Sequence, residues 1–245
     1  MSKILYSLYS SFLFISLTTS TVTVYSQNVV DNSNINFPAT TINKIHELGT
    51  VTVIDVVGDI ECSRNLHDQL KNDIPTLFIA LGDLCYEPDL SNFTNLYSDF
   101  KKANKLSCVI GNHESDENGN LKILNEVRLY CGDHWYRKIA NNTTLLIGLN
   151  TNGNTSLQIN WAQSLVTTSS FMKEIKNVML LSHKPAHMPP GSDHLAENST
   201  IQMFSAIENN ISKNIELYEI AAHNHIMDKS TNGHWFVSGA GGKAL

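Results

Sequence analysis

The sequence predicts an α/β fold with mixed β-sheets flanked by helices. Short apolar runs rich in β-branched residues recur along the chain, and each run ends at a polar residue, as buried strands do. Between the first three runs lie stretches with helical spacing of apolar residues, which predicts parallel β-α-β units. Fewer clear helical stretches separate the later runs, so part of the sheet structure is expected to be mixed.

Seven apolar runs are expected to form strands. They lie at residues 51–59, 76–83, 106–113, 144–151, 178–185, 215–225 and 234–242. The clearest helix is predicted over residues 91–105, where Phe93, Tyr97 and Phe100 share one face behind Ser91, a candidate N-cap. Weaker helical patterns cover residues 62–73, 121–130, 156–173 and 198–209.

Residues 1–26 form an N-terminal segment with almost no charge. Lys3 is its one charged side chain, the next charge is Asp31, and an apolar stretch follows the basic start. This pattern predicts a secretory signal peptide, although the uncharged span is also long enough for an uncleaved membrane anchor. Residues 27–48 are polar and are predicted to be a linker, and residues 49–245 are predicted to form the functional domain. We therefore expect a secreted protein or one on the extracellular surface.

The composition is that of a globular protein light in charge. Of the 245 residues, 42% are hydrophobic and 16% are charged, and the formal net charge is −6. No basic cluster occurs, so nucleic-acid binding is not expected. Contact with a membrane is expected only through an uncleaved anchor. An acidic protein that handles an anionic substrate needs local positive charge, which metal ions can supply.

Four cysteines are present: Cys62, Cys85, Cys108 and Cys131. In an oxidising compartment they can form one or two disulfides, and three complete connectivities are open. The alternative for Cys108, inside "LSCVI", is a small buried residue without a bridge.

The polar residues that end the predicted strands are all of metal-ligand types. The carboxyl ends of strands in an open α/β sheet gather at one edge, where ligands bind. Each residue alone has another explanation, such as a turn or a packed histidine. Together they favour a site for two cations, because a carboxylate can bridge two ions. The set comprises Asp59, Asp83, Asn112, His113, His183, His223 and His225.

Five short motifs occur in a fixed order: "GDIE" (58–61), "GDLCY" (82–86), "GNHE" (111–114), "LLSH" (180–183) and "AHNH" (222–225). This series resembles that of the calcineurin-like metallophosphoesterase superfamily. The tyrosine of "GDLCY" is similar to the G-D-x-x-Y mark of the purple acid phosphatase-like branch, and "QINW" (158–161) is similar to a helical stretch of that branch. The resemblance covers about residues 51–242 and implies an α-β-β-α sandwich.

The resemblance also implies two metal ions and a ligand set. The first metal, Fe(III) in that branch, would be held by Asp59, Asp83, Tyr86 and His225. The second, Fe(II), Zn(II) or Mn(II), would be held by Asp83, Asn112, His183 and His223, so that Asp83 bridges both ions. The implied reaction is hydrolysis of small phosphate monoesters, in which metal-bound hydroxide attacks phosphorus.

Three further residues take roles by the same resemblance. His113 would donate a proton or stabilise charge near the leaving oxygen. Glu114 would orient His113 or a neighbouring loop, and His194 would face the substrate phosphate. His187, in the same loop as His194, is a weaker candidate for a substrate contact.

Two positions depart from the pattern. Glu61 stands where relatives carry His or Gly, and it would either add a carboxylate to the first metal or turn away from it. Ala222 replaces a usual glycine, a change expected to need only local adjustment.

Two other functions remain open: a phosphodiesterase of the same superfamily acting on nucleotides or lipid head groups, and a non-catalytic binding module. Tyr86 favours the phosphatase, and the complete ligand set argues against the binding module.

Overall fold

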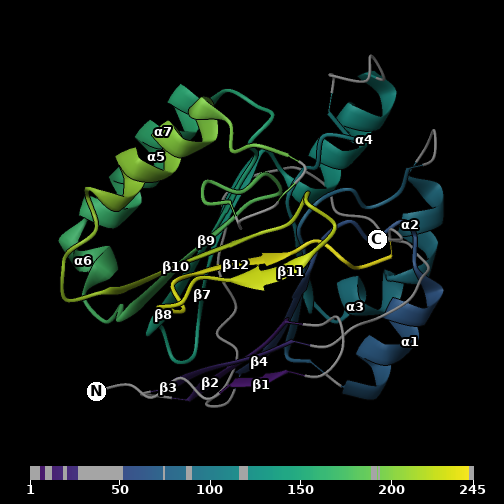
Figure 1. Cartoon of the computed structure of the whole chain (residues 1–245), viewed down its shortest axis with the longest axis horizontal. Coiled ribbons are helices and arrows are strands. Elements are labelled where there is room, and N and C mark those ends of the chain that lie inside the picture. The colour runs from purple at the N-terminus through teal and green to yellow at the C-terminus, as the bar shows by residue number, and fades with distance from the viewer. Residues whose placement is uncertain are drawn as a thin grey trace.

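The computed structural model describes residues 6–8, 13–18, 21–26, 52–73, 75–86, 90–115, 121–188, 192 and 194–242. Two six-stranded β-sheets pack against each other, and helices cover the outer side of each sheet (Figure 1). This is the α-β-β-α sandwich that the motif series implies.

Sheet one contains the first six strands in the order β1-β3-β2-β4-β5-β6. These strands are β1 (Tyr6–Leu8), β2 (Leu13–Thr18), β3 (Thr21–Ser26), β4 (Thr52–Val57), β5 (Leu77–Ala80) and β6 (Leu106–Cys108). Strands β4, β5 and β6 are parallel, with Val56 opposite Ile79 and Ile79 opposite Ser107. Helices α1 (Arg64–Asp73), α2 (Ser91–Leu96) and α3 (Ser98–Lys102) connect them, as the alternating pattern predicts.

Sheet two has the order β11-β12-β10-β9-β8-β7. Its strands are β7 (His134–Ile139), β8 (Thr144–Leu149), β9 (Asn177–Leu181), β10 (Glu216–Ala221), β11 (Met227–Lys229) and β12 (Trp235–Ser238). The four central strands are parallel, whereas β7 and β11 run antiparallel to their neighbours, so the sheet is mixed as expected. The remaining helices are α4 (Leu121–Cys131), α5 (Thr155–Thr167), α6 (Ser169–Met172) and α7 (Asn198–Glu208).

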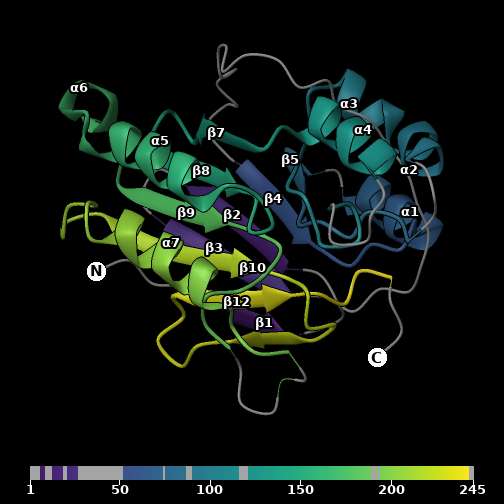
Figure 2. The same ribbon diagram turned by 90° about the horizontal axis from the view of Figure 1, so that it is seen from above.

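The buried apolar residues form three layers. Strand β4 shows how one strand serves two of them: Ile54 and Val56 pack between the sheets, and Val57 packs on the side of α1. On the far side of sheet two, α5 and α7 lie side by side and bury Ala162 and Phe204 (Figure 2). Each fully buried Ile, Val or Phe side chain contributes about 1.5–3 kcal/mol, so the three layers stabilise the packing of the two sheets.

The seven predicted strands are confirmed as β4, β5, β6, β8, β9, β10 and β12, each shorter than its apolar run. The six-residue β7 and the three-residue β11 escaped prediction because their residues are only partly apolar, and β1, β2 and β3 lie in the segment predicted to be a signal peptide or anchor. The predicted helix at 91–105 is interrupted at Tyr97, and Ser91 is its first helical residue rather than its N-cap.

Strands β1, β2 and β3 lie within the segment predicted to be a signal peptide or anchor, and β2 pairs with β4. Cleavage or retention of this segment stays a prediction, and the predicted linker at 27–48 lies outside the described residues. Within the described part of the chain, no helix has the length and apolar character needed to cross a membrane.

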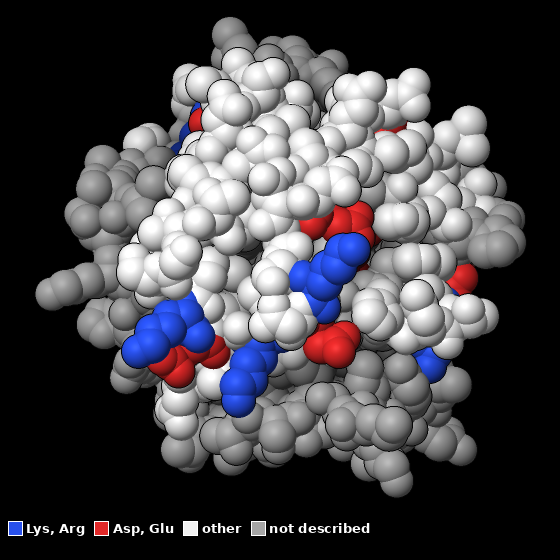
Figure 3. Space-filling model, turned by 90° about the vertical axis from the view of Figure 1, so that its left-hand side faces the viewer, with Lys and Arg blue, Asp and Glu red and all other residues white. Residues whose placement is uncertain are grey.

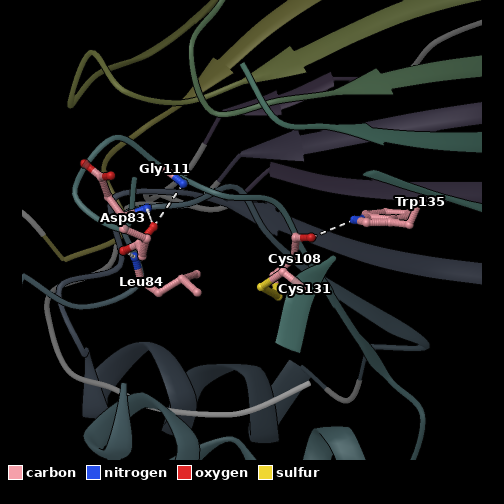
Figure 4. The surroundings of a disulfide bond; sticks show 7 residues. Asp83, Leu84, Cys108, Gly111, Cys131 and Trp135 are labelled. Carbon is pink, nitrogen blue, oxygen red and sulfur yellow. Dashed lines mark hydrogen bonds between the residues drawn. A yellow bond between two sulfur atoms is a disulfide. The ribbon is translucent and has the colours of Figure 1, made fainter. Parts of the chain in front are cut away.

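Two disulfides are present, which resolves the pairing that the sequence left open. Cys62–Cys85 joins the loops that follow β4 and β5, and Cys108–Cys131 joins the end of β6 to the end of α4 (Figure 4). The alternative of an unpaired Cys108 is therefore wrong, although Cys108 is buried as expected.

The molecular face drawn in Figure 3 carries few charged side chains among its described residues. Basic and acidic side chains lie beside one another on it, and no extended basic patch is present there.

Asp55, in the middle of β4, is fully buried, and both its carboxyl oxygens lack a hydrogen-bond partner among the described residues. Burial, with a smaller contribution from Asp73, raises the pKa of Asp55 to about 8. The folded chain therefore holds one proton more than the unfolded chain between about pH 4 and 8, and stability falls as the pH rises through that window. We expect Asp55→Val to raise the free energy of unfolding by about 1–3 kcal/mol at about pH 5, and by several kcal/mol more at about pH 8.

Urea unfolding of the wild type, Asp55→Val and Asp55→Asn at both pH values measures the predicted change in the free energy of unfolding. Asp55→Asn keeps the shape of the side chain but cannot ionise, so it should lose the pH dependence and retain the cost of a buried polar group. An advantage of Asp55→Val that is equal at both pH values would contradict the raised pKa.

Candidate metal centre

The predicted ligands stand just beyond the carboxyl ends of strands from both sheets. Asp59 follows β4, Asp83 follows β5, His183 follows β9, and both His223 and His225 follow β10. The two sheets are joined at this edge, because Gly58 N donates a hydrogen bond to the carbonyl of Ser238, at the end of β12. Ligands far apart in the sequence are thereby brought to one place.

Four of these residues have a left-handed backbone conformation that is uncommon for residues with a side chain. The φ angles are 53° for Asp59, 48° for Asp83, 73° for His223 and 46° for His225. Each such residue costs on the order of 1 kcal/mol or more, and strain of this kind concentrates at functional sites. The conformations turn the chain sharply after the strand.

Glycines provide the space for the acidic side chains. A Cβ at Gly111 would collide with Asp83 Oδ1, and a Cβ at Gly239 would lie 2.7 Å from Asp59 Oδ2. Sequence reasoning missed Gly239, although the glycine-rich run "GAGG" was a signal for a close approach of the backbone. A Cβ at Gly58 would collide with the methyl group of Ala222, so Gly58 accommodates the departure at position 222.

The two carboxylate oxygens of Asp83 face different groups of side chains. Oδ2 accepts a hydrogen bond of 3.1 Å from the Tyr86 hydroxyl, and Oδ1 lies 3.3 Å from His183 Nε2. Oδ1 also accepts a hydrogen bond from the backbone N–H of His113 at 3.1 Å. Asp83 thus divides the site into two parts, which we call the tyrosine half (Asp59, Asp83, Tyr86 and His225) and the amide half (Asp83, Asn112, His183 and His223).

The tyrosine half is centred on Asp59, which is fully buried. Asp59 Oδ1 lies 3.4 Å from the Tyr86 hydroxyl and 3.3 Å from His225 Nε2. The other oxygen, Oδ2, accepts a hydrogen bond of 2.8 Å from the backbone N–H of His223. Asp59 thus lies beside both Tyr86 and His225, and the Tyr86 hydroxyl also contacts Asp83.

The amide half is centred on His183, also fully buried. Its Nε2 lies 2.9 Å from Asn112 Oδ1 and 3.2 Å from His223 Nδ1. Its Nδ1 lies 2.7 Å from the carbonyl oxygen of Leu81, to which it can donate. A backbone carbonyl at Nδ1 leaves Nε2 free to act as a ligand, which is the usual arrangement of a metal-binding histidine.

Burial and neighbouring charges together set the pKa values of the ionisable groups at this site. Burial raises the pKa of Asp59. Burial also opposes the charged forms of Asp83 and His183, but their attraction prevails: the pKa of Asp83 is held below its usual range and that of His183 is raised to about 9. Burial and the nearby imidazoles lower the pKa of His223 to about 3, which keeps its ring neutral and available as a ligand.

The donor chemistry fits cations. Ligand atoms of Asp59, Asp83 and His183 all lie within 4.8 Å of one another, and all three side chains are buried. Burial of two carboxylates so close together is costly unless positive charge accompanies them. Carboxylate, phenol, amide and imidazole groups suit first-row transition metals.

Glu114 is fully buried and holds the loops that carry the ligands. Its Oε2 accepts hydrogen bonds from the backbone N–H groups of Asp83 (2.9 Å) and Gly111 (3.0 Å), and its Oε1 accepts one from Leu84 (2.6 Å). Figure 4 shows these three residues gathered near the disulfide of Cys108. Burial and the Asp83 carboxylate raise the pKa of Glu114 to about 8, against the opposing effect of the N–H groups. Of the roles expected for Glu114, this geometry fits the orientation of neighbouring loops.

Two other predicted site residues lie at the opening of the site. The His113 side chain is 41% exposed, its ring centre is 4.2 Å from that of Tyr86, and its Nε2 lies 3.8 Å from Asp83 Oδ2. The ring centre of His194 lies 4.4 Å from that of His223. His113 thus lies beside Tyr86 and Asp83, and His194 lies beside His223, whereas a contact of either imidazole with a substrate stays a prediction.

His187 and Glu61 were weaker candidates, for a substrate contact and for a metal ligand respectively. His187 Nδ1 lies 2.6 Å from Glu219 Oε2, so this histidine pairs with a residue of β10, and its contact with a phosphate stays a prediction. Glu61 is half-buried with φ 48°, and it is not part of the ligand group of Asp59, Asp83 and His183. Its contribution to the first metal stays a prediction.

Comparison with known proteins gives a family and a fold. The family model for calcineurin-like phosphoesterases matches residues 45–227, whereas no curated protein matches the chain. Similar solved structures include a dimetal phosphatase from Danio rerio, with 14% sequence identity and a TM-score of 0.50 over 75% of this chain and 85% of that one. A putative 5'-nucleotidase from Staphylococcus aureus has 17% identity and a TM-score of 0.45 over 77% of this chain and 48% of that one.

Proposed function

The chain belongs to the calcineurin-like phosphoesterase family, and on this premise we propose that it hydrolyses phosphate monoesters at a centre of two metal ions. The observation that carries the proposal is the Asp83 carboxylate, whose Oδ2 faces the tyrosine half and whose Oδ1 faces the amide half. A carboxylate with one oxygen toward each half suits a pair of cations. The dimetal phosphatase that shares the fold supports this proposal.

The two halves of the site and the two histidines at its opening would have different roles. The tyrosine half would hold one ion, and its phenol favours Fe(III), whereas the amide half would hold Fe(II), Zn(II) or Mn(II). Two bound cations would neutralise the charge of a phosphate and make a water molecule a stronger nucleophile. His113, at the opening, can donate a proton to the leaving oxygen, and His194 can donate a hydrogen bond to a phosphate oxygen.

The proposal is tested by the hydrolysis of nitrophenyl phosphate and bis(nitrophenyl) phosphate side by side. The full chain is supplied with iron and with zinc or manganese, from acidic to neutral pH, and Asp83→Asn serves as the blank. We expect faster turnover of the monoester. Faster turnover of the diester would replace the proposal with a phosphodiesterase, and no turnover of either ester by metal-loaded protein would overturn both in favour of the binding module.

Tyr86→Phe tests the phenol as a ligand. Without a cation, burial and the carboxylates of Asp83 and Asp59 raise the pKa of Tyr86 well above its usual range, so a phenolate requires a bound cation. In iron-loaded protein we expect a visible absorption band from phenolate and Fe(III), and its complete loss in Tyr86→Phe with little change in unfolding temperature.

Tyr136→Phe is the matched control, because Tyr136, on β7, packs against Phe171 of α6 and is not in either half of the site. It should keep the band. A band that persists in Tyr86→Phe would remove Tyr86 from the ligand set.

A further inference from the structure

A buried glutamine fixes the loop that follows β8. Gln158, on α5, accepts a hydrogen bond from Asn150 N and donates one to Asn150 O, both of 2.8 Å. Both residues are 2% exposed. A side-chain amide that pairs twice with one residue's backbone sets the position of that backbone, and its burial is compensated by both bonds. The start of this loop is therefore fixed to α5.

The next two residues of the loop reach toward the amide half. The buried hydroxyl of Thr151 accepts a hydrogen bond of 3.2 Å from the backbone N–H of Lys184. The side-chain amide of Asn152 donates a hydrogen bond of 3.4 Å to the carbonyl of Ile110. Asn152 is itself held, because its backbone N–H donates to Asn150 Oδ1 at 3.0 Å.

The two contacted peptides lie next to metal-ligand candidates. Lys184 directly follows His183, and Ile110 lies two residues before Asn112. The side chains of His183 and Asn112 meet at 2.9 Å in the amide half. One short loop thus holds the backbone beside both members of this pair.

The tyrosine half is held by different contacts. Its two loops are joined by the Cys62–Cys85 disulfide, and Asp59 is held by the backbone N–H of His223. The side-chain hydrogen bonds described for Thr151 and Asn152 go to the peptides beside the amide half. Thr151 and Asn152 therefore support the amide half, and their loss should affect that half more than the tyrosine half.

We propose that Thr151 and Asn152 are positioning residues for the amide half, which hold His183 and Asn112 at the spacing that a cation needs. This inference rests on the proposed two-metal centre. Groups that orient metal ligands change metal affinity about 10–100-fold when they are removed, without contacting the metal themselves.

The test is Zn²⁺ titration calorimetry of the chelator-treated full chain at neutral pH. His223→Ala identifies the binding step of the amide half, and His225→Ala identifies that of the tyrosine half. Thr151→Val replaces the hydroxyl by a methyl group of similar size and leaves the Lys184 N–H without its acceptor. We expect it to weaken the amide-half step about tenfold or more and to leave the other step unchanged.

Thr151→Ser keeps the hydroxyl, so this variant should retain the wild-type Zn²⁺ affinity of the amide-half step. Asn152→Ala, at a half-buried position that the fold tolerates more easily, should weaken the same step if Thr151→Val does not fold. Equal weakening of both steps, or no change in either variant, would overturn the inference. A wild-type chain that binds no Zn²⁺ would overturn the two-metal centre as well, whereas two-step binding without monoester hydrolysis would overturn only the proposed activity.

Discussion

Asp83→Asn is expected to lower turnover of a phosphate monoester by about a hundredfold to a thousandfold or more, and to reduce the metal bound per chain. An asparagine offers one oxygen, so its NH₂ group must face either Tyr86 or His183, where Asp83 places a carboxylate oxygen. A single preorganised group at a reaction centre is worth about 10²–10³ in rate, and this carboxylate faces both halves. Atomic spectroscopy for bound metal, with nitrophenyl phosphate turnover, measures both effects.

The control for this substitution is Asp228→Asn, which makes the same chemical change at an exposed position on β11. It should retain the wild-type metal content and rate. An Asp83→Asn chain that holds two metal ions per molecule and keeps its rate would show that the shared carboxylate is not needed.

Glu114→Ala is expected to lower the free energy of unfolding by about 3–5 kcal/mol, a large part of the stability of an ordinary domain. The change removes the acceptor of three buried N–H groups, those of Asp83, Leu84 and Gly111, and each unsatisfied group costs about 1–3 kcal/mol. Urea unfolding of the metal-free chain measures this effect apart from any effect on metal binding.

Two variants make the measurement specific. Glu114→Gln keeps one carbonyl oxygen, which can still accept from two of the N–H groups, so its loss of stability should be smaller than that of Glu114→Ala. Glu208→Ala, at an exposed position at the end of α7, should change the midpoint little. A Glu114→Ala chain that unfolds at the wild-type urea concentration would exclude a supporting role for this carboxylate.

The main strands and the gathering of the ligands could be predicted from the sequence because both depend on local pattern and on a rule of topology. Asp59, Asp83 and His183 each follow an apolar run, and parallel strands bring their carboxyl ends to one edge. The division of ligands between the two halves came from the family resemblance, and the distances around Asp83 agree with it.

Other features depend on contacts that no local pattern encodes. The pair of His187 and Glu219 joins segments 32 residues apart, and the bond from Lys184 N to Thr151 spans 33 residues. The family resemblance implied a loop-orienting role for Glu114, but the three N–H groups that it holds emerged only with the fold. Strand β7 follows from its pairing with β8 rather than from its own composition.

The disulfide connectivity has a consequence for the order of assembly. The two bridges do not interleave, and in each of them the paired cysteines are 23 positions apart. During synthesis from the N-terminus, Cys62 and Cys85 are both available before Cys108 has been added to the chain. Each cysteine pair can therefore close in turn with the nearest unpaired thiol, and oxidation in the order of synthesis reaches the native pairing without breaking an earlier bridge.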